Sequence, residues 1–499
     1  MGDLLHGLLQ VCSIANLTWC TVGVISGILV GALPGLTATM AVALLVPFTF
    51  GRPIIESMAM LLGIYCGAMY GGSISAILIR TPGTPSGAAT VLDGYPLAKQ
   101  GKAGKAIRMA TVASGIGGLG GALIMTFLSP VISRAALAFS APEYFSLAVF
   151  GLSIIISVSG SSITKGLIAG VFGLLLSTIG LDPSSGYPRF TFGSMELYGG
   201  LAFIPTLIGL FAISEVFINV EDLLTREKTK SKVTDMKLHW SELRGTLKTI
   251  FRSTILGTFI GAIPGAGADI AAFVGYSEAK RGSKHPELFG TGLLEGVAAA
   301  EAANNACTGG AMIPMLSLGV PGDAVTAVLL GALIIQGLQP GPMLFKEHLD
   351  LVNAIFAAMI VANIIMIILG LLGSQYVARI INIDQRILLS VILLLSVVGA
   401  FSMRNSIFDI WVALAFGVIG YFMSKYEFPT SPILLALILG PMTESNLRRA
   451  LIMTHGDWTV FFTRPISLAM LCLAVISVVT SIRKEQQARV IANDDNITS

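Results

Sequence analysis

Charged residues are scarce in this sequence. Asp, Glu, Lys and Arg together make up 12% of its 499 residues, whereas soluble domains carry about 25%. No charged residue occurs between Leu4 and Gly51, and the mean hydropathy of the chain is +0.81. Such long apolar runs exclude a soluble globular protein, and they differ from the short alternating strands of a membrane barrel. The sequence therefore predicts an all-α integral membrane protein with multiple spans.

Motifs for ATP-driven and hydrolytic chemistry are also absent. No Walker A pattern occurs, and neither H-E-x-x-H nor G-x-S-x-G is present, so we expect neither ATP-driven transport nor an enzyme. The five cysteines and five histidines are dispersed without ligand-like spacing, and they predict no disulfide, metal site or cofactor. A net charge of +3 does not suggest nucleic acid as a partner.

One glycine-rich motif needs a different interpretation. The sequence GIGGLG at 115–120 fits the dinucleotide-binding pattern, but it lies in an uncharged run with no strand before it. We interpret Gly117 and Gly121 as a small-residue face where two helices pack closely.

Thirteen apolar segments are candidates for crossing a hydrocarbon core of about 30 Å. They lie at 17–50, 57–79, 106–132, 141–159, 162–180, 199–219, 249–277, 293–335, 350–372, 386–403, 407–424, 431–443 and 465–482. Several are broken by Pro and Gly, so we expect roughly 10 to 14 membrane segments.

Basic residues indicate how the chain is divided. The longest polar segment, 221–252, carries eight Lys and Arg residues, and the positive-inside rule places it in the cytoplasm. We therefore predict a first membrane half at 1–220, a cytoplasmic basic linker at 221–248, a second membrane half at 249–485 and a polar tail at 486–499.

The two halves share a pattern of interrupted apolar segments. GALPG at 31–35 matches GAIPG at 261–265, and further along TPG at 81–83 matches VPG at 320–322. The double match predicts an internal repeat. Because we place an odd number of crossings before the linker, we expect the second copy to be inverted, as in many secondary transporters.

A Pro-Gly break removes backbone hydrogen bonds inside an apolar segment. In hydrocarbon an unpaired peptide group costs several kcal/mol, so such a break survives only inside protein or beside a water-filled cavity. Helix N-termini at the break would face an anion, and unwound carbonyls would suit a cation. A single break is often a simple kink, but two matched pairs favour a binding site.

Four long segments resemble the large membrane subunit of the tripartite tricarboxylate transporters. They are GALPGLTATMAVALLVPF, YGGSISAILIRTPGTPSGAATVLDGYPLAKQGKAGKA, GAIPGAGADIAAFVGYSEAKR and GVPGDAVTAVLLGALIIQGLQPGP. The resemblance implies a carrier of the bacterial inner membrane with about twelve spans. It also implies a small membrane subunit and a periplasmic solute-binding protein as partners. Tricarboxylates or dicarboxylates are the expected substrates, and Na⁺ or H⁺ is the expected coupling ion.

The breaks and the resemblance together mark candidate site residues. We expect substrate to be bound around Pro34, Gly35, Thr37, Ser73, Arg80, Thr81, Pro82, Gly83, Thr84, Pro264, Gly265, Gly267, Pro321 and Gly322. We expect the coupling ion at Asp269, Asn304, Asn305 and Asp323, because an ionisable group at membrane depth is costly and usually functional.

Several of these residues have a second interpretation. Asp269 and Asp323 both follow a Pro-Gly turn, so each is also a candidate helix cap. Arg80 either pairs with a substrate carboxylate or extends to the membrane interface. We expect Glu295 and Glu301 on a solvated helix start. For the whole chain, the alternatives are an anion channel and a docking subunit without ion coupling.

Overall fold

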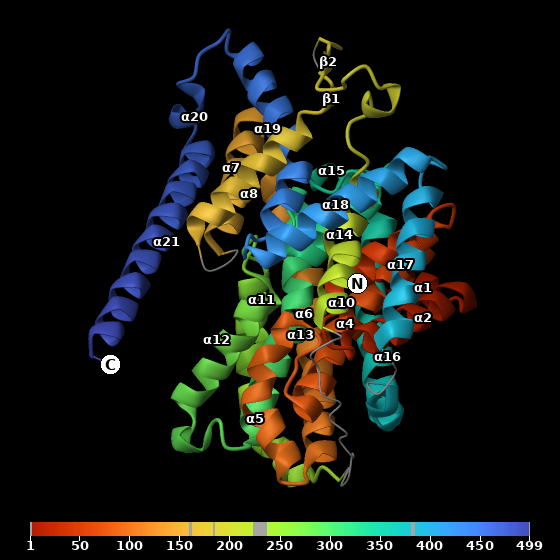
Figure 1. The fold of residues 1–499 in the computed structure, drawn as a ribbon, viewed down its shortest axis with the longest axis vertical. Coiled ribbons are helices and arrows are strands. Elements are labelled where there is room, and N and C mark those ends of the chain that lie inside the picture. Colours follow the sequence, from red (N-terminus) through yellow and green to blue (C-terminus); the bar gives the residue numbers. More distant parts are fainter. Residues whose placement is uncertain (1, 159–161, 183–184, 223–236, 381–384, 499) are drawn as a thin grey trace.

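The computed structural model describes residues 2–158, 162–182, 185–222, 237–380 and 385–498. These residues form helices almost throughout (Figure 1), and the strands among them are very short. Strand β1 (Gly180–Leu181) pairs antiparallel with β2 (Pro188–Arg189). The predicted all-α fold class is therefore confirmed.

The helices fall before and after the predicted linker. The first group is α1 (Gly2–Val11), α2 (Ile14–Gly31), α3 (Ala38–Leu45), η1 (Val46–Thr49), α4 (Ile54–Ile79), η2 (Pro85–Gly87), α5 (Ala88–Lys99), α6 (Ala103–Ala136), α7 (Ala141–Val158), α8 (Ile163–Ser177), η3 (Met195–Leu197), α9 (Phe203–Leu207), η4 (Ile208–Ile213) and α10 (Ser214–Asp222). The second group is α11 (Trp240–Gly261), α12 (Gly267–Gly282), η5 (Pro286–Leu288), α13 (Leu294–Leu318), α14 (Ala324–Ile335), α15 (Pro342–Glu347), α16 (Leu349–Ile380), α17 (Gln385–Ser402), α18 (Ile407–Lys425), α19 (Ser431–Met453), α20 (Val460–Thr463) and α21 (Pro465–Thr498). The segment predicted as a linker thus ends inside α11, while its residues 223–236 lie outside the described residues. Helix α21 runs through the segment predicted as a tail.

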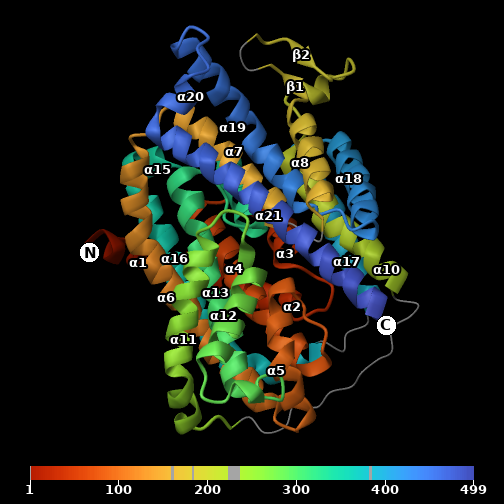
Figure 2. The ribbon, with the colours of Figure 1, turned by 90° about the vertical axis from the view of Figure 1, so that its left-hand side faces the viewer.

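Seven helices of the described chain are long and apolar enough to cross a membrane. They lie at Ile14–Gly31, Ile54–Ile79, Ala103–Ala136, Phe203–Glu221, Leu349–Gly373, Ile407–Lys425 and Pro465–Arg483. The last of these belongs to α21, which packs on α7 along one side of the molecule (Figure 2). A multi-pass membrane protein is thus confirmed, and the figure of about twelve spans stays a prediction.

All four Pro-Gly motifs interrupt helices. GALPG separates α2 from α3, and GAIPG separates α11 from α12, with Gly35 at φ 86° and Gly265 at φ 82°. Such left-handed backbone is cheap only for glycine, which explains the residue type at both turns. The second motif of each half separates α4 from η2 and α13 from α14.

The helices flanking these breaks touch backbone to backbone. A Cβ on Gly27 of α2 would lie 2.3 Å from the carbonyl oxygen of Ile64 on α4, and one on Gly257 of α11 would lie 2.2 Å from that of Ala303 on α13. Helix α6 approaches α13 in the same way, because a Cβ on Gly117 would lie 2.3 Å from the Ala302 oxygen. A Cβ on Gly121 would lie 2.4 Å from the Ala306 carbonyl oxygen. The predicted small-residue face is therefore confirmed.

A buried carboxylate fastens α5 to the connection between α12 and α13. Asp93 is fully buried, and its Oδ1 accepts backbone hydrogen bonds of 2.8 to 2.9 Å from Gly290, Gly292 and Leu293. Its Oδ2 accepts from the Tyr276 hydroxyl at 2.9 Å. These hydrogen bonds fix the connection on α5.

Replacing Asp93 by Ala should therefore destabilise the protein. Three backbone N–H groups would lose their acceptor, and we expect a cost of roughly 2–4 kcal/mol. Size-exclusion profiles of heated, detergent-solubilised protein measure the apparent unfolding temperature. Asp93→Asn keeps a carbonyl oxygen for the N–H groups and should unfold nearer the wild type. Equal unfolding temperatures for Asp93→Ala and the wild type would contradict this role.

Candidate functional site

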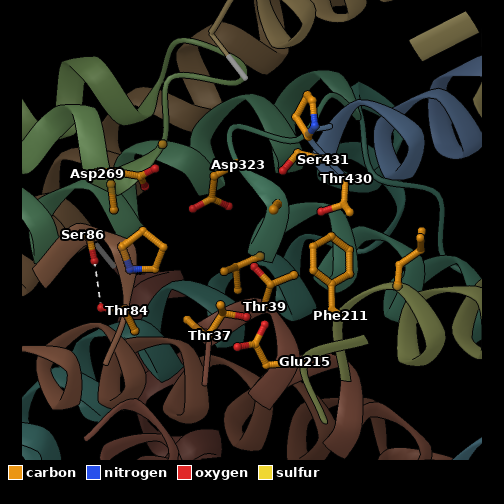
Figure 3. A pocket seen from close by; sticks show the side chains of 18 of the residues that line it. Thr37, Thr39, Thr84, Ser86, Phe211, Glu215, Asp269, Asp323, Thr430 and Ser431 are labelled. Carbon is orange, nitrogen blue, oxygen red and sulfur yellow. Dashed lines mark hydrogen bonds between the residues drawn. The ribbon is translucent and has the colours of Figure 1, made fainter. Parts of the chain in front are cut away.

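A cavity of about 450 Å³ lies where the four helix breaks meet (Figure 3). Each break contributes a wall segment, at Thr37–Thr39, Thr84–Ser86, Gly265–Ile270 and Asp323–Val325. The remaining wall comes from Met69 on α4, from residues between Leu210 and Ile218, which include the end of the π-helical η4, and from the end of α18 and the start of α19. Segments far apart in the sequence therefore converge on one space.

Helix N-termini surround this cavity. Thr37 caps α3 by accepting a hydrogen bond of 3.1 Å from the Met40 N–H, and Asp323 caps α14. Helix α12 begins at Gly267 without a side-chain cap, and η2 begins at Pro85 without one. The positive ends of these helices make the cavity a suitable environment for an anion.

Asp323 is both a cap and a wall residue. Its Oδ1 accepts from the Thr326 N–H at 2.7 Å and from the Thr326 hydroxyl at 2.8 Å. Its Oδ2 accepts from the Tyr65 hydroxyl at 2.5 Å, which joins α4 to α14. Asp323 can therefore be both a helix cap and a candidate ligand of the coupling ion.

Two further carboxyl groups line the cavity, and their side chains are more accessible. Asp269 lies exposed in the first turn of α12, and Glu215 accepts a hydrogen bond of 2.9 Å from Asn219 on α10. Figure 3 shows Asp323 and Glu215 pointing into the cavity from opposite walls. Among the described residues that line the cavity, none is Lys, Arg or His. The space thus combines positive helix ends with three acidic side chains.

The structure brings some of the predicted site residues to this wall and places others behind it. Those that line the cavity are Thr37, Thr84, Gly265, Gly267, Asp269 and Asp323. Those outside the lining are Pro34, Gly35, Ser73, Arg80, Thr81, Pro82, Gly83, Pro264, Asn304, Asn305, Pro321 and Gly322.

The residues outside the lining include the glycines that join the breaks. A Cβ on Gly83 would lie 1.7 Å from the Gly31 carbonyl oxygen, and one on Gly322 would lie 2.7 Å from that of Gly261. The Gly265 N–H donates to the Gly322 oxygen at 2.7 Å. These contacts hold the two breaks of each half together, so the residues that line the cavity keep fixed positions.

Arg80 ends α4 in the left-handed conformation and is exposed. Its guanidinium lies 6.0 Å from the centre of the Tyr95 ring. Arg80 does not belong to the cavity lining.

A polar layer lies behind the cavity and centres on Glu301. Asn304 donates to the Met69 carbonyl oxygen at 3.2 Å, and Asn305 donates to the Glu301 carbonyl oxygen at 3.3 Å. Glu301 is fully buried within α13, so its predicted place on a solvated helix start is wrong. The helix begins earlier, at Leu294, and α6 covers it through the close contact of Gly117. Glu295 does lie at the helix start and is partly exposed.

Sequence reasoning missed several wall residues. Phe211 and Glu215 belong to the stretch around η4, whose π-helical turn leaves no signature in the sequence. Thr430 and Ser431 lie between two prolines in the sequence FPTSP at 428–432, and this further interrupted segment was the signal that could have found them.

Comparisons with known proteins agree with this architecture. The model of the tripartite tricarboxylate transporter TctA family matches residues 17–435. A similar protein of Agrobacterium vitis, described as an uncharacterized 52.8 kDa protein in the TAR-I ttuC' 3' region, is 40% identical over 483 residues, 96% of each chain. A second protein of that organism, described as an uncharacterized protein in the TAR-II ttuC' 3' region, is 36% identical over 242 residues, 48% of this chain and 100% of its own length. No solved structure matches.

Proposed function

Because this chain belongs to the tripartite tricarboxylate transporter TctA family, we propose that it is the subunit that carries carboxylates across the bacterial inner membrane. Import is driven by a gradient of Na⁺ or H⁺, and the substrate is a tricarboxylate or dicarboxylate. A small membrane subunit and a periplasmic solute-binding protein complete the transporter, and the binding protein delivers the solute.

One observation supports this proposal most directly. Helix N-termini from all four breaks face a cavity that contains three carboxyl groups and no basic side chain in its described lining. Helix ends attract a carboxylate, but Asp269, Asp323 and Glu215 repel it unless cations or protons bind as well. A simple anion pore would carry Arg or Lys in this position. The composition of the cavity therefore favours coupled binding of an anion and cations.

We assign the residues two kinds of role. The N-termini at Thr37, Thr84 and Gly267 hold the substrate carboxylates. Asp323 and Asp269 bind the coupling ion next to them, because hard cations prefer oxygen ligands. Asn304 and Asn305 support this region from behind Met69, and the other predicted residues shape the breaks.

The arrangement of helices supports an internal repeat, which we propose is inverted. Helices α2 to α5 and α11 to α14 follow one another with breaks at matching positions. Helix α6, which follows the first set, packs on α13, whereas α16, which follows the second set, packs on α4. We propose that the two sets are related by a pseudo-twofold axis and that access alternates around the cavity between them.

Uptake measurements test the proposal. In vesicles containing the chain with both partner subunits, we expect uptake of radiolabelled citrate or succinate to saturate. It should fall by about tenfold or more when ionophores remove the Na⁺ and H⁺ gradients, because a carrier then only equilibrates its solute. Flux that neither saturates nor depends on the gradients would identify a channel. Absence of any flux would favour the docking subunit.

A further inference from the structure

The buried carboxyl groups of the described chain differ in their ion-pair and hydrogen-bond partners. Six are buried, namely Asp93, Glu143, Asp182, Glu301, Asp323 and Asp409. Arginines pair with three of them, as Arg464 does with Glu143, Arg448 with Asp182 and Arg404 with Asp409. Backbone N–H groups donate to Asp93 and Asp323. Among the described residues, Glu301 has neither kind of partner.

Within the described part of the chain, hydroxyl groups are the polar partners of the Glu301 carboxyl, among them that of Ser73 on α4. Thr90 of α5 donates to its Oε1, and Ser114 of α6 donates to its Oε2 at 2.8 Å. Both hydroxyl residues are themselves buried. An ionised carboxylate with only neutral partners at membrane depth is costly. A hydroxyl can also accept a hydrogen bond, so the same contacts fit a protonated carboxyl that donates to one of them.

The surroundings of Glu301 have more acceptors than donors. The side-chain carbonyl oxygens of Asn304 and Asn305 are buried, and neither has a hydrogen-bond partner among the described residues. These two residues lie about one turn after Glu301 on α13. A proton on Glu301 would add a hydrogen-bond donor to a region that has unpaired acceptors. More of the buried polar groups could then form hydrogen bonds.

Glu301 lies close behind the cavity wall. Its partner Thr90 follows the wall residue Ser86 by about one helical turn. On the other side, Asn304 donates to the backbone of Met69, which also lines the cavity. The polar layer around Glu301 therefore adjoins the cavity wall on two sides.

We propose that Glu301 is a proton-binding site of the transport cycle, an inference that rests on the proposed function. The carboxylate takes up one proton from cavity water when the cavity faces outward, and releases it after the cavity faces inward. No other bond forms or breaks. A substrate with two or three negative charges crosses without net charge movement only if more than one cation crosses with it. A second cation site besides Asp323 would supply one of these charges.

Other titratable groups are near but do not bind this carboxyl. The nearest titratable or charged residues on the helices packed around Glu301 are Tyr70 on α4, Asp93 on α5, Arg108 on α6, Arg252 on α11 and Tyr276 on α12. Tyr70 hydrogen-bonds with Thr111 at 2.7 Å, and Tyr276 donates to Asp93. None of the five forms a hydrogen bond or ion pair with Glu301 among the described residues. We therefore assign the proton uptake to Glu301 and not to one of these neighbours.

Glu301→Gln tests the proposal, and Glu295→Gln provides a matched control. Glu295 also accepts from two hydroxyls, those of Thr249 and Ser283, but at the partly exposed start of the same helix. In vesicles with both partner subunits, Glu301→Gln should lose about tenfold or more of citrate accumulation driven by a pH gradient. Exchange of internal for external citrate needs no net proton transfer and should persist. Glu295→Gln should retain both activities.

Ser114→Ala gives a second readout if Glu301→Gln does not fold. Losing a donor destabilises the ionised carboxyl, so the proton is held more tightly and the midpoint of the pH dependence should shift to higher pH. Wild-type coupling in Glu301→Gln would overturn the inference, and so would an unshifted midpoint in Ser114→Ala. Wild-type uptake that follows Na⁺ and ignores pH would overturn it while leaving the proposed function intact, whereas no uptake with any gradient would overturn the proposed function.

Discussion

Gly83→Ala is expected to leave almost no folded protein in the membrane. The added Cβ would lie 1.7 Å from the Gly31 carbonyl oxygen and 3.0 Å from the Ser75 hydroxyl oxygen. The first of these atoms is backbone, and Gly31 is itself pressed against Ala68 of α4. Neither helix can yield without separating the two breaks, so we expect a cost above about 3 kcal/mol, the upper end of overpacking. Membrane yield and size-exclusion profiles after heating measure the effect.

Two other glycines calibrate this experiment. Gly322→Ala should also destabilise, but less, because its Cβ would lie 2.5 Å from the Ala311 Cα and 2.7 Å from the Gly261 oxygen. Gly245→Ala is the control: it lies exposed in α11, and its Cβ would meet nothing within 4 Å. Alanine there should be neutral or stabilise the helix by up to about 1 kcal/mol. If Gly83→Ala folds as well as Gly245→Ala, the close contact between the breaks is not needed for folding.

Asp323→Asn is expected to fold but to lose about tenfold or more of ion-driven uptake, because the charge that holds the coupling ion is gone. The remaining carbonyl oxygen can still accept from the Thr326 N–H, now bonded at 2.7 Å. The new amide can donate to the Tyr65 hydroxyl, so shape and capping are preserved. Initial uptake rates against Na⁺ concentration and pH, with the partner subunits present, measure the loss.

Asp323→Thr separates the capping role from the charge. Threonine caps α3 at Thr37 in the same structure, so it should preserve the start of α14 while removing the carboxyl group. We expect the Thr variant to fold and to transport as poorly as the Asn variant. Uptake at the wild-type rate and ion dependence in Asp323→Asn would leave capping as the role of this residue.

The helical fold and its interruptions could be predicted from the sequence, because both depend on local chemistry. Proline and glycine at 34–35 and 264–265 lie just after the ends of α2 and α11, as their helix-breaking chemistry predicts. The spacing of Gly117 and Gly121 likewise predicts a helix contact, since small residues four apart share one face. Asp323 could be singled out in the same local way, because it directly follows the Pro-Gly turn at 321–322.

The enclosure of the cavity could not be predicted in this way. Tyr65 meets Asp323 from a helix 258 positions away in the chain, and no local pattern encodes such a contact. Glu301 was misplaced because α13 carries small and apolar residues on all sides of the helix, which gives no periodicity to separate a buried face from a solvated one. The π-helical turn at Ile208–Ile213 also depends on packing and not on a sequence signal.

The backbone contacts between α2 and α4 have a mechanical consequence. Cβ atoms on Gly23, Gly27 and Gly31 would each lie within 2.3 Å of an α4 carbonyl oxygen, so the helices interlock over successive turns. Sliding one helix along the other would force atoms of the two backbones into overlap. The pair therefore moves as one rigid unit. A change in the shape of the cavity would therefore come from parts of its wall outside this helix pair, such as the residues between Leu210 and Ile218.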